Sequence, residues 1–411
     1  MKRIRDIEIW MLLIIMVLTS CSDHSGESSD ENGDCFLDIY VYSPEHPMLT
    51  RADVGEIASR SVAENTVHTL QIWVFKHSDG SKAVGYLETT PTFLNETDGQ
   101  EKFRMEVGKE FADHPENVDV YVVANAGSVG LTTLDKETTR AELDAAKIGT
   151  GYFGTTDLYD KEDLLPSSDP TTGRIARAGL PMSGVLKDQS IYGSYPTLRV
   201  GTQAAMATVQ LTRAVSKLRF VLCRKTEDLQ TTKKMLVSID GIQLNGNKIP
   251  TESYLMPMST PSYSSFVTDP INYSGIEKID IPQVNNPMVY IYDKQEAQEY
   301  ENLINTAIGG GQLTELGLTY LRESDQQLTG VITYKYKERN SLDTEWDNNS
   351  LVEETADAQF SMATAGDFLR NHSWIVYIFF MDEKIHVLTV TNIGMKIWGN
   401  GGMETHDVYN W

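Results

Sequence analysis

The sequence predicts a mainly β protein built from two β-sandwich domains with a few short helices. Segments in which apolar and polar residues alternate recur along the chain, and this period of two is typical of half-buried strands. Clusters of Gly, Pro, Ser and Thr, such as residues 165–173 and 256–265, separate these segments as surface loops. The length of 411 residues with 40% hydrophobic residues is enough for two ordinary domains. These observations favour packed sheets over a βαβ arrangement.

The first strand is expected over residues 35–42. Leu37, Ile39 and Val41 share one side of this segment, and Phe36, Asp38, Tyr40 and Tyr42 share the other. Two further strands are expected over residues 68–75 and 118–124, each with one apolar face. A short helix is predicted near residues 139–147, because Thr139 and Glu142 have the spacing of a capping box.

The second half of the chain continues the strand pattern. Strands are expected over four segments, residues 236–244, 329–338, 372–380 and 385–398. A helix is predicted within residues 294–311, which end in three glycines. Its apolar stripe consists of Tyr300, Leu303, Ile304 and Ile308. The boundary between the two domains is expected near Gly201.

Charge and motif content exclude several classes of function. The formal net charge of −23 would repel a phosphate backbone, so nucleic acid is not expected as a partner. The eight histidines are scattered without zinc-ligand spacing, and no metal is expected. Residues 149–154 match GxGxxG, but they follow a predicted helix instead of leaving a strand, so no dinucleotide cofactor is expected. No nucleophile elbow, HExxH or Walker loop occurs, and the chain is predicted not to be an enzyme.

The N-terminus has the pattern of a bacterial lipoprotein signal peptide over residues 1–20. Lys2, Arg3 and Arg5 precede an apolar run over residues 9–18, which is too short to span a bilayer core of ~30 Å as a helix. The sequence Leu-Thr-Ser-Cys then resembles a lipobox, with Cys21 as the acylated residue. An ordinary secretory peptide with an accidental cysteine is the alternative interpretation.

The segment after Cys21 is predicted to be an extended tether. Residues 22–34 include five acidic residues with Ser and Gly, and they offer almost no apolar side chain to bury. No Lys or Arg occurs from Ser22 to Thr50, so Arg51 is the first Lys or Arg after the lipobox. Besides Cys21 only Cys35 and Cys223 remain, and a structural disulfide between them is not expected.

Several segments together resemble the fimbrillins, the subunits of type V pili. The segments are the lipobox, the first strand followed by "TRADVG", "VYVVANAG", "LTRAVSKLRFVL", "FLRNHSWIVYIFF" and the final "HDVYNW". They occur in the expected order over nearly the whole chain, although residues 225–365 match only in general character. The resemblance implies two transthyretin-like, Greek-key β-sandwich domains.

The resemblance also implies how the chain matures. Such subunits are exported as lipidated precursors, and the acidic run after the cysteine resembles a signal for display on the outer face of the outer membrane. A trypsin-like protease then cuts after an arginine and removes the lipidated tail with the first strand. Cleavage between Arg51 and Ala52 fits this role, with Arg60 as the alternative site. Leu37, Ile39 and Val41 would leave with the removed strand.

The expected organisation follows from this resemblance. It is a signal peptide over residues 1–20, a tether with the removable strand over 21–51, an N-terminal sandwich over 52–200 and a C-terminal sandwich over 201–411 that includes the donor tail. A C-terminal strand of another copy would fill the vacated place by β-strand addition. Two C-terminal segments are candidates for this donor, residues 385–398 and the tail that contains Val408, Tyr409 and Trp411.

The predicted function is that of a stalk or tip subunit of a fimbria that mediates adhesion. The expected partners are other fimbrial subunits, the maturation protease, the membrane through the N-terminal lipid, and a ligand on a host or bacterial surface. A lipid-anchored surface protein that binds glycans is the alternative, since the chain has 19 Tyr and 6 Trp. A surface hydrolase is disfavoured because no catalytic set is recognisable.

Overall fold

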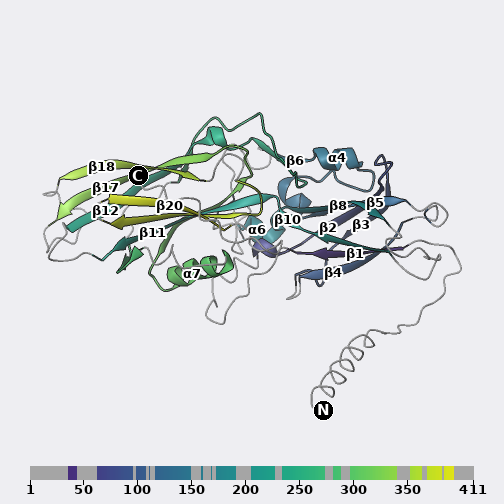
Figure 1. The fold of residues 1–411 in the computed structure, drawn as a ribbon, viewed down its shortest axis with the longest axis horizontal. Helices are drawn as coiled ribbons and strands as arrows, with labels where there is room; N and C mark the ends of the chain where they lie inside the picture. Colours follow the sequence, from purple (N-terminus) through teal and green to yellow (C-terminus); the bar gives the residue numbers. More distant parts are fainter. Residues whose placement is uncertain are drawn as a thin grey trace, which may run out of the picture.

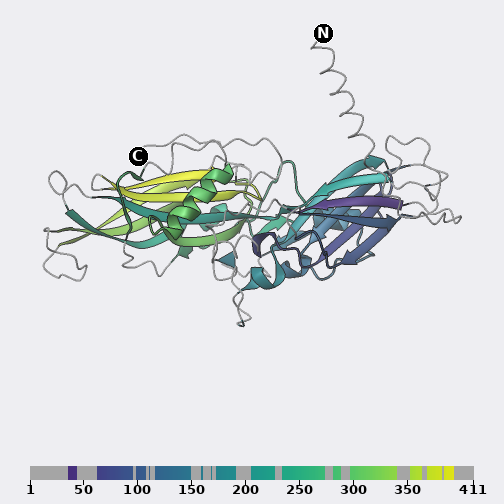
Figure 2. The ribbon, with the colours of Figure 1, turned by 90° about the horizontal axis from the view of Figure 1, so that it is seen from below.

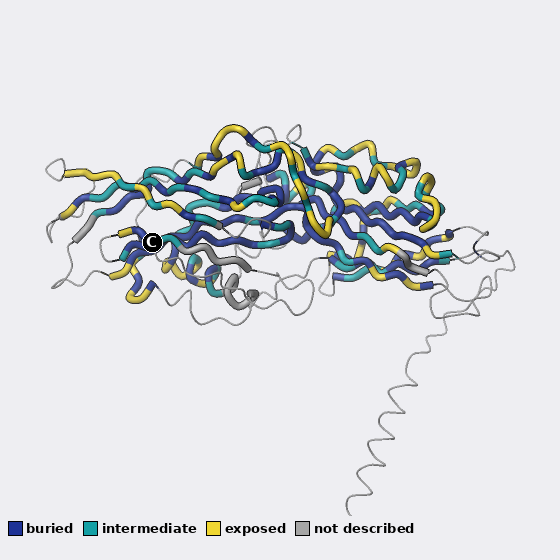
Figure 3. Tube along the Cα trace, turned by 45° about the horizontal axis from the view of Figure 1, so that its top comes forward, coloured by how far each residue is buried: buried dark blue, intermediate teal, exposed yellow. Residues whose placement is uncertain are grey.

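A computed structural model gives the fold of this chain as two lobes that lie end to end along the long axis of the molecule (Figure 1). The structure describes residues 36–43, 63–95, 99–107, 111, 116–149, 159–160, 168, 173–190, 205–226, 234–273, 281–287, 297–339, 352–362, 368–381 and 384–392. The predicted mainly β architecture with short helices is confirmed. Buried strands run through both lobes and exposed residues gather on the connections and edges (Figure 3).

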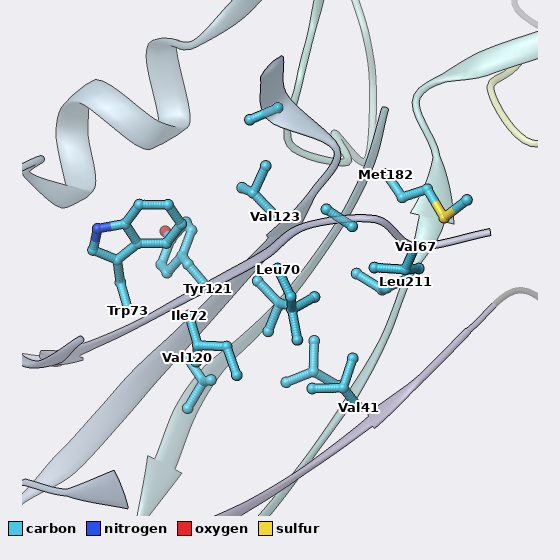
Figure 4. Packing of buried hydrophobic residues seen from close by; sticks show 14 of the residues in the cluster. Val41, Val67, Leu70, Ile72, Trp73, Val120, Tyr121, Val123, Met182 and Leu211 are labelled. Atoms are coloured by element: carbon cyan, nitrogen blue, oxygen red, sulfur yellow. The ribbon is translucent and has the colours of Figure 1, made fainter. Parts of the chain in front are cut away.

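The first lobe contains two sheets that enclose one apolar cluster. The smaller sheet has the order β4-β1-β9, with bounds Gln100–Glu106, Phe36–Tyr42 and Ala205–Gln210. The larger sheet has the order β10-β8-β5-β2-β3, with bounds Thr212–Arg213, Met182–Ser190, Asn117–Ala124, Leu70–Lys76 and Ala83–Thr89. Side chains from both sheets meet between them, among them Val41, Leu70, Ile72 and Leu211 (Figure 4).

The central strands of the larger sheet are buried on both faces. Alternation in the sequence predicts one core face for β2, yet Trp73 and Phe75 on its other side are also wholly buried. The connection after β5 covers that side, and Trp73 Nε1 donates a hydrogen bond to the Asp135 carbonyl oxygen at 2.7 Å. This connection contains the 3-10 helix η1, Ala126–Val129, and the helix α4, Arg140–Ala145. A layer of irregular chain therefore completes the core of this lobe.

The second lobe contains a further pair of sheets and one longer helix. One sheet has the order β20-β19-β11-β16-β7, with bounds Lys384–Asn392, Ser373–Met381, Val215–Lys225, Thr314–Arg322 and Tyr159–Asp160. The other has the order β14-β12-β17-β18, with bounds Ile271–Tyr273, Lys234–Leu244, Leu328–Arg339 and Glu353–Met362. Short pairings add β15, Gln283–Val284, to β11, and join β6, Lys147–Gly149, to β13, Glu252–Tyr254.

The described part of the chain contains three α-helices of five residues or more, and two of them were predicted. Thr139 and Glu142 form the capping box of α4, in which the Thr139 amide donates to Glu142 Oε2 at 2.7 Å. Helix α7, Ala297–Gly309, buries Ile304 against β11 and β19 and ends at the glycines, of which Gly311 has a left-handed φ of 68°. The third, α6, spans Arg174–Ala178.

Cys223 lies under α7, and its thiol is expected to be unreactive in the folded chain. Burial raises its pKa to about 11, while a hydrogen-bond contact between its sulfur and the Tyr377 hydroxyl, at 2.8 Å, partly offsets this effect. The thiolate fraction at pH 8 should therefore be on the order of 100-fold below that of an exposed thiol. Titration of Cys223 with a thiol reagent in a Cys21→Ser/Cys35→Ser variant should show slow labelling in buffer and rapid labelling in denaturant. Rapid labelling in both conditions would contradict the burial of this side chain.

Candidate functional site

Strand β1 is the central strand of the smaller sheet of the first lobe. It runs antiparallel to β4, with Ile39 opposite Phe103, and parallel to β9, with Ile39 opposite Ala207. Figure 2 shows this strand in purple within the first lobe. Both of its edges are therefore hydrogen-bonded to neighbouring strands. If β1 were absent, β4 and β9 would each present a row of unpaired backbone N–H and C=O groups to the same gap.

The inner face of β1 contributes directly to the core of the first lobe. Leu37, Ile39 and Val41 have no exposed surface and belong to the same apolar cluster as Leu70 and Ile72 of β2. The alternation predicted from the sequence places these three side chains on one face, and the burial agrees with it. At about 2 kcal/mol for each buried aliphatic side chain, they contribute about 6 kcal/mol of gross burial free energy. Loss of β1 would therefore open an apolar groove along the sheet.

The outer face of β1 is held by charge and aromatic contacts to β4. Asp38 is 7% exposed, and its carboxylate lies 2.7 Å from Lys102 Nζ and 3.6 Å from Arg104 Nε. The same two cations lie over aromatic rings of β1: Lys102 Nζ is 5.8 Å from the Tyr40 centroid, and Arg104 Cζ is 5.0 Å from that of Phe36. The basic pair of β4 thus recognises an acidic residue flanked by aromatic residues on the neighbouring strand.

Hydrogen bonds also fix the C-terminal end of β1. The Leu211 amide donates to the Tyr42 carbonyl oxygen at 2.9 Å, and the Gln210 side chain donates to the Ser43 carbonyl oxygen at 2.8 Å. The Ser43 amide donates to the carbonyl oxygen of Gly99 at 2.7 Å. These bonds hold the strand in register up to the residue at which the described segment ends.

The chain is described again from Ala63, where it is anchored between the two lobes. Residues 63–65 form a buried helical turn. The carboxylate of Glu64 lies 2.8 Å from Lys217 Nζ and accepts a hydrogen bond from the Tyr320 hydroxyl, and both partners come from second-lobe strands. Arg213 Nε donates to the Glu64 carbonyl oxygen at 3.2 Å. The segment that follows both predicted cleavage sites is therefore tied to strands of the second lobe.

Most residues predicted to take part in processing and assembly lie outside the described residues. They are Cys21, Arg51, Ala52, Arg60, Val408, Tyr409 and Trp411. The last described residue is Asn392, at the end of β20, so this strand confirms the first part of the predicted segment 385–398. The removable-strand residues Leu37, Ile39 and Val41 are the part of the predicted site that the structure brings together.

Two segments of the family resemblance meet at the junction of the lobes. Arg213, from "LTRAVSKLRFVL", donates through Nη1 to Asn371 Oδ1 at 2.9 Å, and Asn371 comes from "FLRNHSWIVYIFF". The preceding residue, Arg370, forms a buried ion pair with Glu323 at 2.5 Å and donates to the Leu255 carbonyl oxygen at 2.7 Å. Charged residues inside otherwise apolar segments are the local signal from which this network could have been predicted.

The third such segment, "VYVVANAG", ends strand β5 at a residue in the left-handed region. Asn125 has a φ of 57°, and its side chain bonds to two separate stretches of backbone, residues 66–69 and Leu180. Its Oδ1 accepts from the His68 amide at 2.8 Å, and its Nδ2 donates to the Thr66 and Leu180 carbonyl oxygens at 3.0 and 2.8 Å. This side chain closes the end of the first lobe next to the anchored residues 63–65, so its role is structural.

The part of the chain that the structure describes shows neither a metal-binding cluster nor a membrane-spanning helix. Among those residues no group of His, Cys, Asp and Glu side chains is placed to hold a metal ion. Within the same ranges no helix combines the length and apolar character needed to cross a bilayer.

Comparisons with known proteins give structural neighbours only, since no family model and no curated protein matches the sequence. The chain is similar to a fimbrial assembly protein from Parabacteroides distasonis, with 12% identity, a TM-score of 0.41 and coverage of 87% of this chain and 95% of that chain. It is also similar to the tip fimbrial protein Mfa3 from Porphyromonas gingivalis, with 13% identity, a TM-score of 0.39 and coverage of 87% and 99%. A fimbrilin from the same organism gives 11% identity, a TM-score of 0.39 and coverage of 84% and 89%.

Proposed function

We propose that this chain is a structural subunit of a cell-surface fimbria of type V, either stalk or tip, that polymerises by exchange of a β-strand after proteolysis. The observation that carries the proposal is the position of β1, which fills the centre of a sheet while its inner face fills the core. A strand at an edge of the sheet would leave one unpaired row of backbone groups on removal. Removal of this strand leaves two rows and an apolar groove between them.

A strand from another copy can satisfy such a groove. Main-chain hydrogen bonds to β4 and β9 would supply affinity, and alternate side chains would occupy the places of Leu37, Ile39 and Val41. The contact joins the tail of one copy to the groove of the next, so it does not close on itself and produces an open filament. This geometry accounts for a fibre built from a single kind of chain.

The proposed precursor is an outer-membrane lipoprotein acylated at Cys21 and held on the cell surface by the acidic tether. The lipid and β1 lie on the same side of Arg51, so one cut after β1, at Arg51, would release the subunit from the membrane and free β1 to leave the groove. The same cut would therefore release the subunit from the membrane and make it able to accept a strand from another copy. The proposal includes adhesion of the fimbria to a ligand on a host or bacterial surface.

Cleavage after Arg51 is favoured over cleavage after Arg60. A protease binds several residues on each side of the scissile bond in an extended conformation. Ala63 and Glu64 lie three and four residues after Arg60, and both are buried in a helical turn. Arg51 lies twelve residues before Ala63, so this buried turn is beyond the residues that a protease would bind around Arg51.

We also propose two domains, with a junction that differs slightly from the predicted residue 201. Ala205, Ala207 and Val209 of β9 and the following Leu211 lie in the first-lobe cluster. The next long strand, β11, begins at Val215 and belongs to a second-lobe sheet. The pairing of strands therefore favours a junction at about residue 214.

The proposal is tested by treating the purified full-length precursor with an arginine-specific protease. The expected products are a fragment that ends at Arg51, a main chain that begins at Ala52, and multimers that resist SDS. N-terminal sequencing identifies the cleavage site, and gel electrophoresis measures the multimers. Arg51→Ala should reduce multimer formation at least about tenfold, while Arg60→Ala should leave it unchanged.

Two results would contradict the proposal. Cut protein that retains the residue 35–42 fragment and remains monomeric would show that β1 does not exchange. Equal loss of multimers in Arg51→Ala and Arg60→Ala would show that the site was assigned wrongly. A thermal unfolding measurement on each uncut variant serves as the control for folding, because neither arginine lies among the described residues.

A further inference from the structure

Residues 249–267 form an arm that leaves the second lobe and returns to it. Its two ends, Ile249 and Val267, are buried in the apolar cluster between the second-lobe sheets. The Val267 amide donates to the Ile249 carbonyl oxygen at 2.9 Å, and the next pair along the arm, Pro250 and Phe266, forms an isolated β-bridge. The base of the arm therefore belongs to the second lobe.

The middle of the arm is built into the first lobe. Leu255 is wholly buried and Met256 is 2% exposed, and both belong to the same apolar cluster as Leu70 and Ile72 of β2. The Leu255 amide donates to the Ala146 carbonyl oxygen at 2.8 Å. Two apolar side chains carried by the second lobe thus complete the core of the first.

Strand β13 of the arm depends on both lobes for its pairing. Among the described strands it is paired with β6 alone, with Ser253 opposite Ile148, and both of these residues are wholly buried. Figure 1 shows β6 at the end of the first lobe that faces the second. Each strand has three residues, and a two-stranded sheet of this size is not stable in water by itself. The pairing therefore exists only while each lobe holds its own strand in place.

The carbonyl oxygen of Leu255 accepts one hydrogen bond from each lobe. Ser183 Oγ, on β8 of the first lobe, donates at 2.5 Å, and Arg370 Nη1, from the segment before β19 in the second lobe, donates at 2.7 Å. Both donor residues are buried. If either lobe unfolded, a buried polar group would lose one of its two donors, which is unfavourable.

We propose that the arm makes the two lobes a single folding unit, in which neither lobe unfolds while the other stays native. Lobes with separate cores would ordinarily open independently. Here, unfolding of the second lobe withdraws Leu255 and Met256 from the first-lobe core, and unfolding of the first lobe removes β6 from β13. The inference goes beyond the proposed function and does not depend on it. In a fimbria it would mean that a pull along the fibre meets one unit in each subunit instead of two.

The cores of the two lobes are also continuous beside the arm. Leu318 and Tyr320 of β16 are 3% exposed and belong to the first-lobe cluster, although β16 is a strand of a second-lobe sheet. These contacts also oppose separation of the lobes. Substitutions in the arm are therefore needed to show how much of the coupling the arm provides.

The first experiment measures each lobe separately in the full-length chain. In a urea series, pulsed hydrogen–deuterium exchange with mass spectrometry reports on the first lobe through peptides of β2 and β5, and on the second through peptides of β11 and β19. Leu70→Ala removes a wholly buried side chain from the first lobe. It should lower the urea midpoints of both lobes together by at least about 0.5 M. A second-lobe midpoint that stays at the wild-type value would overturn the proposal.

The second experiment repeats this measurement in arm variants. In a Leu255→Asp chain, adding Leu70→Ala should move the first-lobe midpoint alone, because a carboxylate at this place disfavours insertion of the arm into the apolar cluster. Met258→Asp is the matched control, since Met258 lies on the same arm and is 43% exposed. Adding Leu70→Ala to this control should still move both midpoints.

Equal shifts of the two lobes in the Leu255→Asp chain would show that the arm is not what joins them, and would overturn its proposed role. If the Leu255→Asp chain has no folded lobe in buffer, Met256→Ala takes its place as a milder change in the same cluster. In that background Leu70→Ala should move the second-lobe midpoint less than the first-lobe midpoint. Equal shifts there would again overturn the proposal.

Discussion

Replacing Ile39 with Asp is expected to lower the free energy of unfolding of the uncut precursor by at least about 4 kcal/mol. The substitution removes about 2 kcal/mol of aliphatic burial and places a carboxylate without a partner in an apolar cluster. Ile39 has no exposed surface and lies between β4 and β9, so the new side chain cannot reach water while the strand stays in register. Chemical denaturation followed by tryptophan fluorescence measures the change.

A neighbouring position provides the matched control. Thr208 lies on β9, the strand next to β1, opposite Tyr40, and it is exposed on the outer face. Thr208→Asp introduces the same side chain into the same sheet, and it should lower the free energy of unfolding by no more than about 1 kcal/mol. Equal destabilisation by the two substitutions would show that the inner face of β1 does not contribute specifically to the core. It would also remove the groove on which strand exchange depends.

Local sequence patterns predicted the parts of the fold that local physics determines. The alternation of Leu37, Ile39 and Val41 identified the buried face of β1 because side chains on a strand alternate regardless of what the strand pairs with. The capping box of α4 was predictable for a similar reason, since Thr139 and Glu142 satisfy each other's backbone within one turn. In both cases the signal lies within a few residues.

The pairing partners of β1 could not be predicted in this way. Ile39 pairs with Phe103 and with Ala207, which are far apart in the sequence, and the pairing with β9 is parallel. Strand partners at such distances depend on the whole topology, which periodicity does not encode. Burial of both faces of β2 was missed for the same reason, because the layer that covers Trp73 is an irregular connection from further along the chain.

The buried charges are the clearest case of information missing from the sequence. Glu64, Glu323 and Arg370 resemble ordinary surface residues in a chain with 58 acidic residues. Their burial follows from how the lobes meet, and each acid there has a basic partner within 2.8 Å. Charged residues within apolar segments, such as Lys217, are the only local indication of such a pair.

The ion pair between Arg370 and Glu323 makes a second large effect expected at this junction. Arg370→Met should lower the free energy of unfolding by about 3 to 5 kcal/mol, because it leaves the carboxylate of Glu323 buried without its cation. Glu323 is 2% exposed, and its remaining hydrogen-bond donors are the Arg370 amide at 3.2 Å and the Tyr263 hydroxyl at 2.7 Å. Burial, reinforced by the charge of Glu323, raises the pKa of Tyr263, so this hydroxyl stays protonated and cannot replace the lost charge.

Removing both charges distinguishes the destabilisation by an unpaired carboxylate from the net contribution of the ion pair to the free energy of unfolding. The double variant Arg370→Met/Glu323→Gln should recover much of the loss, because no buried charge then lacks a partner. Lys136→Ala is the control for an exposed pair, since Lys136 lies 3.7 Å from Glu137 and both side chains are largely exposed; its denaturation midpoint should not change measurably. If Arg370→Met and the double variant were equally destabilised, the loss would come from the backbone contacts of Arg370 to Tyr254 and Leu255 and not from its charge. Arg370 would then stabilise the junction mainly through hydrogen bonds that join β13 to the segment before β19. A neutral side chain of the same length that donates hydrogen bonds would be tolerated at this position.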